Sequence, residues 1–157
     1  MSVNNPFFDI SLLPYQAPRF DLIEDSHYRP AFDEALRQKR ADIDAIIAQT
    51  SPPDFDNTVL ALEKSGAMLS RVSSVFFAMT SAHTNDDLQA LDEQFSTELA
   101  ELANDIWLND TLFSRVERVW QDRAALDAES RRLVEETWQH FVLAGARLNA
   151  AEKAELK

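Results

Sequence analysis

Large apolar side chains return every three or four residues along most of this 157-residue chain, which is the spacing of one face of an α-helix. No segment alternates convincingly between apolar and polar residues, as a half-buried strand would. The two glycines, Gly66 and Gly145, provide none of the glycine-containing hairpin turns that join such strands. The sequence therefore predicts an all-α fold, an antiparallel bundle or layer of helices. The cleanest apolar stripe consists of Leu88, Leu91, Phe95, Leu99, Leu102 and Ile106.

Polar capping residues and prolines divide this pattern into separate helices. The first is predicted to begin at the capping residue Ser26 and to end before the segment 49–54, which contains two prolines. The second is predicted from Asp56 or Asn57 to about Thr80, and its wide apolar arc is typical of a central helix. A third helix follows the cap at Asn85, and shorter helices are expected over 112–120 and from about residue 129.

The first 25 residues differ from the rest because prolines alternate with large apolar groups. Each proline fixes its own φ angle and favours an extended residue before it. We therefore expect an extended arm over 1–25, packed on a helical region over 26–157. A flexible tail is the alternative, but disordered tails are poor in aromatic residues. The side chains expected to hold the arm are Phe7, Phe8, Leu13, Tyr15 and Phe20.

The last residues, 149–157, have strong helix propensity, and Asn149 is suited to cap them. No glycine, asparagine or proline ends this helix before Lys157. This pattern predicts that the chain is a fragment of a longer protein.

Composition excludes several classes of function. Fifteen Lys and Arg against 27 Asp and Glu give a net charge of −12, which disfavours nucleic acids and anionic membranes as partners. The absence of cysteine excludes disulfides, thiol nucleophiles and cysteine-bound metals. The apolar runs are too short to span a membrane, and no basic residue precedes Arg19 as a secretory signal would require. We expect a cytoplasmic protein.

The residues themselves form no recognisable catalytic group. The three histidines are His27, His83 and His140, and Glu136 lies four residues before His140 on one helix face. Two ligands do not make a zinc site, so a partly solvated ion pair is the better interpretation of Glu136 and His140. The paired carboxylates fall on polar helix faces, where charge usually serves solvation. We therefore predict no catalytic residue, no metal ligand and no cofactor in this chain, and its substrate-binding residues are unknown.

Several segments resemble, in order, the amino-terminal region of the thimet-oligopeptidase-like zinc metallopeptidases. Each segment alone is weak evidence, whereas their common order from one end of the chain to the other is strong. They include His27-Tyr28-Arg29-Pro30 and Asp56-Asn57-Thr58-Val59 at two predicted helix starts. The full set covers residues 5–7, 13–15, 27–34, 56–66, 71–85, 91–96 and 141–146.

The resemblance implies a parent enzyme several times longer, almost wholly helical, with two halves flanking a deep channel. Members of the family bind one zinc ion through a His-Glu-x-x-His helix and a later glutamate, and the motif's glutamate activates the zinc-bound water. One branch releases dipeptides from the carboxyl end of oligopeptides. This chain contains none of those residues, so no catalytic position can be carried over. It resembles the helical layer that roofs and gates the channel.

Two hypotheses follow from the sequence. In the first, the chain is the amino-terminal region of a zinc peptidyl-dipeptidase, and its partners are the remainder of that enzyme and oligopeptide substrates. In the second, it is a free-standing all-α interaction module that shares only ancestry with the family. The open carboxyl end and the family-like start favour the first hypothesis.

Overall fold

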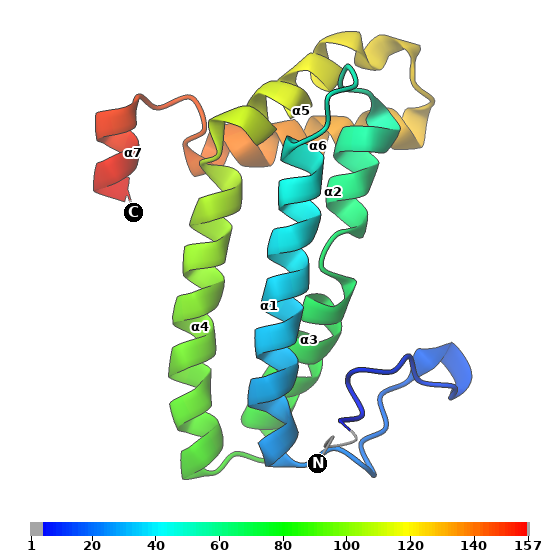
Figure 1. Ribbon diagram of the computed structural model, residues 1–157, viewed down its shortest axis with the longest axis vertical. Helices are drawn as coiled ribbons and strands as arrows, with labels where there is room; N and C mark the ends of the chain where they lie inside the picture. The colour runs from blue at the N-terminus through cyan, green and yellow to red at the C-terminus, as the bar shows by residue number, and fades with distance from the viewer. Residues whose placement is uncertain (1–4, 157) are drawn as a thin grey trace. The chain divides into compact units, whose positions relative to one another are not determined.

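The computed structural model describes residues 5–156; most of these residues are helical, and none of them lies in a β-strand. Residues 1–4 of the expected arm and Lys157 of the expected last helix lie outside this range. The all-α prediction is therefore confirmed for the described residues. Short helical turns occupy Pro14–Gln16 (η1), Phe55–Leu60 (η2, a π-helical turn) and Arg123–Ala125 (η3). The α-helices, shown in Figure 1, are α1 (Asp25–Ile47), α2 (Ala61–Lys64), α3 (Ala67–Ala82), α4 (Asp86–Trp107), α5 (Asp110–Asp122), α6 (Ala128–Ala144) and α7 (Ala150–Leu156).

The chain forms two compact units, each assembled from two separate segments. The first unit takes the residues up to Arg40 together with Gly66–Glu98, and the second takes Ala41–Ser65 together with Leu99–Lys157. These two units do not test the predicted division into an arm over 1–25 and a helical region over 26–157, which stays a prediction.

Aromatic rings form the core of the first unit, where α1, α3 and α4 meet. Phe32 of α1 stacks on Phe95 of α4, with ring centroids 3.8 Å apart. Phe76 of α3 contacts Phe95 edge-on at 4.7 Å and Tyr28 of α1 at 5.1 Å. The side chains of these four residues are almost fully buried. Leu91, which belongs to the stripe that predicted α4, is only half-buried.

The amino-terminal arm is fixed at its base and exposed beyond it. Asn5 is buried and its amide donates to the carbonyl of His27 (2.8 Å), while Phe7 is buried against Tyr28. Phe7 therefore makes the contact expected of it. The other four side chains expected to hold the arm are exposed, which contradicts that expectation: they are Phe8, Leu13, Tyr15 and Phe20.

The helix predicted from residue 56 to about residue 80 is interrupted at Ser65 and Gly66. Gly66 has a φ of 73°, a left-handed conformation that glycine adopts readily and that ends α2 before α3 begins. The apolar residues on the two sides of this break serve different units. Val59 and Leu62 are buried in the second unit, whereas Val72 and Phe76 are buried in the first. The wide apolar arc therefore consists of two stripes on two helices, and the prediction of one central helix is wrong.

In the second unit, α5 and α6 run antiparallel and pack on the segment that begins with η2 (Figure 1). Val59, Val119 and Val134 form its buried cluster, and Trp120 stacks on Trp138 with ring centroids 4.4 Å apart. Asp127 caps α6 by accepting hydrogen bonds from the backbone N–H groups of residues 129 and 130. These contacts give the second unit its own apolar core.

The last helix, α7, begins at the predicted cap. The side chain of Asn149 accepts from the N–H groups of Ala151 (2.9 Å) and Glu152 (3.1 Å), and Glu152 bonds back to the N–H of Asn149 (2.8 Å). Lys153 is buried and forms an ion pair with Asp110 at the start of α5. This pair fixes α7 within the second unit.

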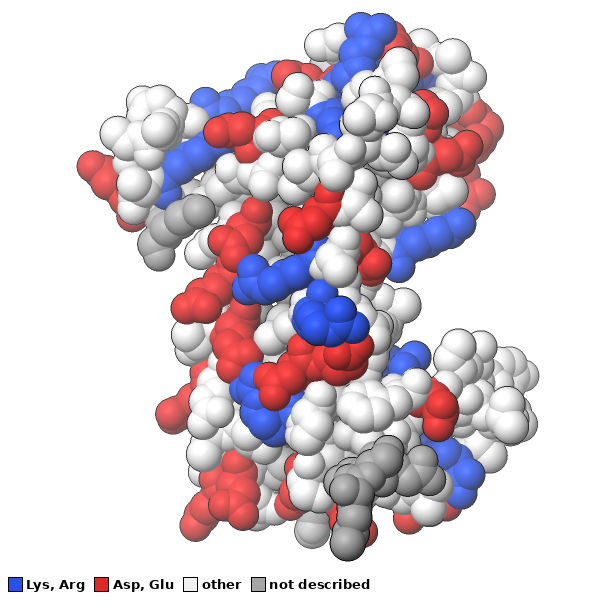
Figure 2. Space-filling model, viewed as in Figure 1, with Lys and Arg blue, Asp and Glu red and all other residues white. Residues whose placement is uncertain are grey.

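Acidic side chains line α4, which contains seven Asp or Glu residues and no Lys or Arg. Figure 2 shows them as a red column along this helix. One of them, Glu98, forms an ion pair with Arg29, so the negative charge of α4 is partly neutralised within the first unit. Among residues 5–156, no helix combines the length and apolar character that a membrane span requires.

Candidate functional site

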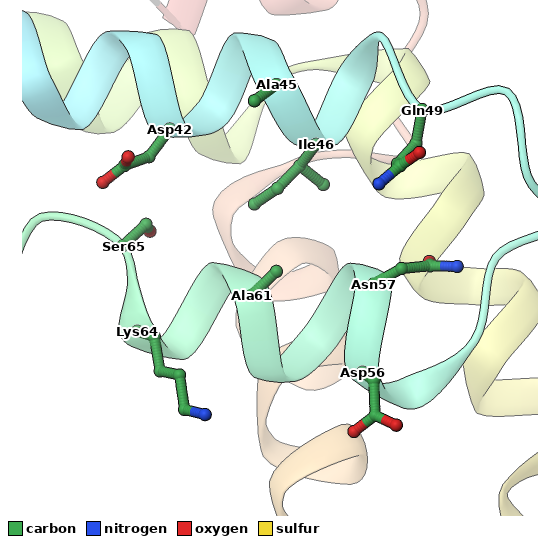
Figure 3. Close-up of a pocket in the computed structure, with 9 residues that line it drawn as sticks. All are labelled: Asp42, Ala45, Ile46, Gln49, Asp56, Asn57, Ala61, Lys64 and Ser65. Carbon is green, nitrogen blue, oxygen red and sulfur yellow. The ribbon is translucent and has the colours of Figure 1, made fainter.

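A polar cleft of about 440 Å³ lies within the second unit, between the end of α1 and the segment formed by η2 and α2. Figure 3 shows the side chain of Ala61 directed toward α1, while those of Asp56 and Lys64 point away from it. Ala45 and Ile46 form the apolar wall on the α1 side. The remaining lining is polar and comes from Asp42, Gln49, Asn57 and Ser65.

A reciprocal cap shapes the η2 side of the cleft. The carboxylate of Asp54 accepts from the backbone N–H of Asn57 (2.8 Å), and the side-chain oxygen of Asn57 accepts from the N–H of Asp54 (3.1 Å). The amide of Asn57 also donates to the carbonyl of Pro52 (2.9 Å). Asn57 thus fixes both the start of η2 and the proline-containing loop before it.

Arg115 of α5 joins this cap to the loop that follows α1. It is 8% exposed, and its guanidinium donates to the carbonyl of Gln49 (3.0 Å) and to the side-chain oxygen of Asn57 (2.9 Å). A longer contact of 3.5 Å reaches the carbonyl of Ser51. A planar guanidinium suits this role because it offers several donors in fixed directions. Arg115 therefore holds one wall of the cleft.

The cleft contains no arrangement for nucleophilic catalysis among its described residues. Ser65 provides its only hydroxyl, and this hydroxyl donates to the carbonyl of Leu62 (2.5 Å). A serine nucleophile needs a base within hydrogen-bonding distance. The lining side chains of Asp42, Gln49 and Asn57 can bind polar groups, and no histidine lines the cleft to act as such a base.

A second cleft, of about 490 Å³, lies in the first unit between α1, the start of α3 and Phe8. Glu34 and Arg37 in its wall form an ion pair of 2.6 Å. Hydrogen bonds from Arg37 and then from Gln38 lower the pKa of Glu34 to about 2. This carboxylate therefore stays ionised near neutral pH, so it cannot act as a general acid there.

Arg29, from the motif at the start of α1, connects two helices of the first unit. Its guanidinium contacts both carboxylate oxygens of Glu98, at 2.7 and 3.0 Å, and it also pairs with Asp33. The hydrogen bonds with Glu98 and then with Asp33 raise the pKa of Arg29 above its usual value. This bidentate pair fixes α4 against α1 in the first unit.

The three histidines do not come together as a metal site. The Nδ1 atom of His27 accepts from the backbone N–H of Glu24 (3.0 Å), and His140 stacks on Trp107 with centroids 4.0 Å apart. Glu136 accepts from Arg132 (2.7 Å), so the expected ion pair between Glu136 and His140 is replaced by these two contacts. Among residues 5–156, no group of three or more His, Cys, Asp or Glu side chains is placed to hold a metal ion.

The segments that carried the family resemblance have structural roles in this region. His27 and Asn57 fix helix starts, Tyr28 belongs to the core and Arg29 forms an ion pair across helices. Gly145 ends α6 with a φ of 102° and lets the next N–H reach back to Phe141 (2.9 Å). The sequence analysis missed the cleft and Arg115, although the Asp-Asn-Thr segment beginning at residue 56 marked one of its walls.

Comparison with known proteins identifies close relatives over almost the whole chain. No family model matches the sequence. The chain is 65% identical to "Dipeptidyl carboxypeptidase" of Salmonella typhimurium over 155 residues, which is 98% of this chain. It is 64% identical to "Dipeptidyl carboxypeptidase" of Escherichia coli over 159 residues. A weaker relative is "Oligopeptidase A" of Escherichia coli, 25% identical over 85% of this chain.

These relatives are much longer than the chain. The chain spans 23% of the length of each dipeptidyl carboxypeptidase and 20% of the oligopeptidase A. The resemblance to peptidases is confirmed, and it concerns one region of those longer proteins.

Proposed function

We propose that this chain is the amino-terminal helical region of a zinc-dependent peptidyl-dipeptidase, which releases dipeptides from the carboxyl end of oligopeptides. The observation that carries the proposal is the 65% identity to "Dipeptidyl carboxypeptidase" of Salmonella typhimurium over 98% of the chain. The partners of the region are then the remainder of the enzyme and its oligopeptide substrates. We also propose that the enzyme is cytoplasmic.

Within the enzyme, this region roofs and gates the substrate channel and carries no catalytic residue. Its motif residues cap helices, fill cores and pair charges, which are contacts that build a rigid layer. A layer without a general acid, base or metal ligand acts on the reaction through access and through the placement of peptide and water. The net charge of −12 adds a screened attraction for cationic peptide ends, which is strongest at low salt.

The zinc ion of the proposed enzyme does not fit the residues described here. His27 is buried with its Nδ1 atom engaged, Glu136 binds Arg132 and His140 stacks on Trp107. We therefore expect the zinc ligands in the part of the enzyme outside this chain. The contribution of this region is structural and steric.

A chimera tests the proposal directly. This chain replaces the matching region of Escherichia coli "Dipeptidyl carboxypeptidase", to which it is 64% identical. If the proposal is correct, the purified chimera releases dipeptides from an oligopeptide with a kcat within about tenfold of the parent's. The separate 157-residue chain serves as the control and should release none. A folded, zinc-loaded chimera without activity would favour the free-standing interaction module.

The gating role is tested in the same chimera by neutralising the two charged side chains on the η2–α2 side of the cleft, Asp56 and Lys64. We expect Asp56→Asn with Lys64→Gln to change KM for a long peptide by at least about threefold, while kcat on the shortest substrate stays nearly constant. The exposed pair Arg118 and Asp122 on α5 gives a matched control, Arg118→Gln with Asp122→Asn. A loss of about 1000-fold in kcat on the shortest substrate would instead indicate a direct catalytic role.

A further inference from the structure

The arm contains an exposed apolar surface that none of the described residues covers. We define the apolar arm surface as the exposed side chains of Ile10, Leu12, Leu13, Tyr15, Phe20 and Leu22. Leu12 and Tyr15 are fully exposed. A cleft of about 610 Å³ lies among these residues and is lined by Pro6, Ile10, Leu12, Leu13 and Leu22, among others. Clustered exposed apolar side chains of this kind mark an interaction site.

The arm is held in place at both ends. Arg71 of α3 donates to the carbonyl of Phe7 (2.7 Å), and α1 begins at Asp25. Between these points, backbone hydrogen bonds close successive turns, such as that from Gln16 to Leu13 (2.9 Å). The apolar arm surface therefore sits on a loop that is anchored at both ends.

The backbone at the tip of the loop adopts an unfavourable conformation. Tyr15 and Gln16 have φ angles of 59° and 56°, in the left-handed region that bulky residues seldom occupy. Such residues persist where surrounding contacts hold them. Backbone hydrogen bonds from Gln16 to Leu13 (2.9 Å) and from Ala17 to Pro14 (3.2 Å) close this turn, whereas the fully exposed Tyr15 side chain packs on none of the described residues. This points to a partner that packs on the tip.

The charge of the arm defines the chemistry of that partner. The charged side chains that line its cleft are Asp9 and Arg19, and Arg19 is neutralised by its pair with Asp21 at 2.7 Å. The surface is thus apolar and nearly neutral, although the whole chain carries a net charge of −12. A second copy would bring another chain with a net charge of −12 close to the first, and the two chains would repel each other as a whole.

We propose that the apolar arm surface docks on the part of the full-length peptidase that lies outside this chain. The proposal rests on the proposed function. The match to the Salmonella typhimurium relative covers 98% of this chain but only 23% of the relative. About three quarters of such a protein therefore remains to supply the partner. Docking buries Leu12 and Tyr15 in an apolar contact and holds the roof on the channel.

The test compares two contexts, the separate 157-residue chain and the chimera with Escherichia coli "Dipeptidyl carboxypeptidase". In the separate chain, Leu12→Ser with Tyr15→Ser should leave Tm unchanged, because both side chains are already exposed. In the chimera, the same pair should lower Tm by at least about 3 °C. The matched control, Leu12→Met with Tyr15→Phe, keeps the apolar surface and should leave both Tm values unchanged.

Hydrogen exchange on the unsubstituted proteins gives a second measurement that does not depend on a variant. Amides of residues 8–22 should exchange at least about tenfold more slowly in the chimera than in the separate chain. An unchanged exchange rate, or an unchanged Tm of the substituted chimera, overturns the proposal. An equal loss of Tm in both contexts also overturns it, because the two side chains would then be packed within the chain.

Two further measurements separate the other interpretations. Sedimentation velocity on the separate chain detects self-association. A dimer abolished by the serine pair, with the Tm of the chimera unaffected, would make a second copy the occupant and overturn the proposal.

Dipeptide release by the unsubstituted chimera tests the proposed function independently. An inactive chimera with a protected arm contradicts the function and supports docking, while an active chimera with an unprotected arm does the reverse.

Discussion

Replacing Phe76 with alanine is expected to lower the free energy of unfolding by about 3–5 kcal/mol. The Phe76 side chain is fully buried, and its ring contacts those of Tyr28, Phe77 and Phe95 at centroid distances of 5.1, 5.2 and 4.7 Å. Alanine removes these contacts and leaves a cavity where α1, α3 and α4 meet. Because rings from three helices surround the site, the neighbours cannot collapse into the space without moving a helix.

Urea unfolding of the separate chain, followed by circular dichroism, measures this loss. Phe20→Ala removes the same side chain from an exposed position in the arm and should cost no more than about 0.5 kcal/mol. Phe76→Leu keeps most of the volume and should fall between the two. If Phe76→Ala and Phe20→Ala cost the same, the aromatic cluster does not form the core of the first unit.

Local features of the sequence were sufficient to predict most of the helices. The stripe that includes Leu88, Phe95 and Ile106 predicted α4, and these three side chains are buried. The caps at Asn85 and Asn149 were also predicted, and each accepts a hydrogen bond from its helix's first turn. These features depend on residues a few positions apart, so the sequence contains the information needed to find them.

Features that depend on distant residues could not be predicted in the same way. The break at Gly66 divides one apolar pattern between two units, and the periodicity does not show which partner each half meets. The exposure of Leu13 and Phe20 was missed because aromatic and apolar content indicates burial without naming the surface that provides it. Packing of the arm within this chain was assumed, whereas only its base is buried.

The candidate site was hidden from the sequence for a related reason. Asn57 and Arg115 are 58 positions apart, and nothing in the sequence around either residue indicates that they are in contact. Arginine on an amphipathic helix normally indicates the solvated face, yet Arg115 is buried beside the loop after α1. The family-like segment at Asp56 showed that this wall was distinctive, but its role became clear only from the contacts.

Removal of the Arg115 guanidinium should be the second most destabilising of these changes. Arg115→Met keeps the aliphatic stem but removes the hydrogen bonds that the guanidinium donates to the carbonyl of Gln49 and to the side-chain oxygen of Asn57. Hydrogen bonds from a charged group stabilise a fold more than neutral ones, and two of them are lost here, so we expect a loss of about 2–4 kcal/mol. Arg115→Lys should recover only part of this, because one ammonium cannot reach both acceptors in the same geometry.

Arg118 on the same helix provides the matched control, because it is exposed and pairs with Asp122 at 3.0 Å. Arg118→Met should cost no more than about 0.5 kcal/mol in the same urea experiment. Amides of residues 49–57 should exchange faster in Arg115→Met than in the unsubstituted chain. Arg118→Met should leave their exchange rate unchanged, because only Arg115 holds that loop. Equal effects of the two substitutions on stability and on this loop would mean that Arg115 does not shape the cleft wall. The cleft's role in gating would then have to depend on α1 and α2 alone.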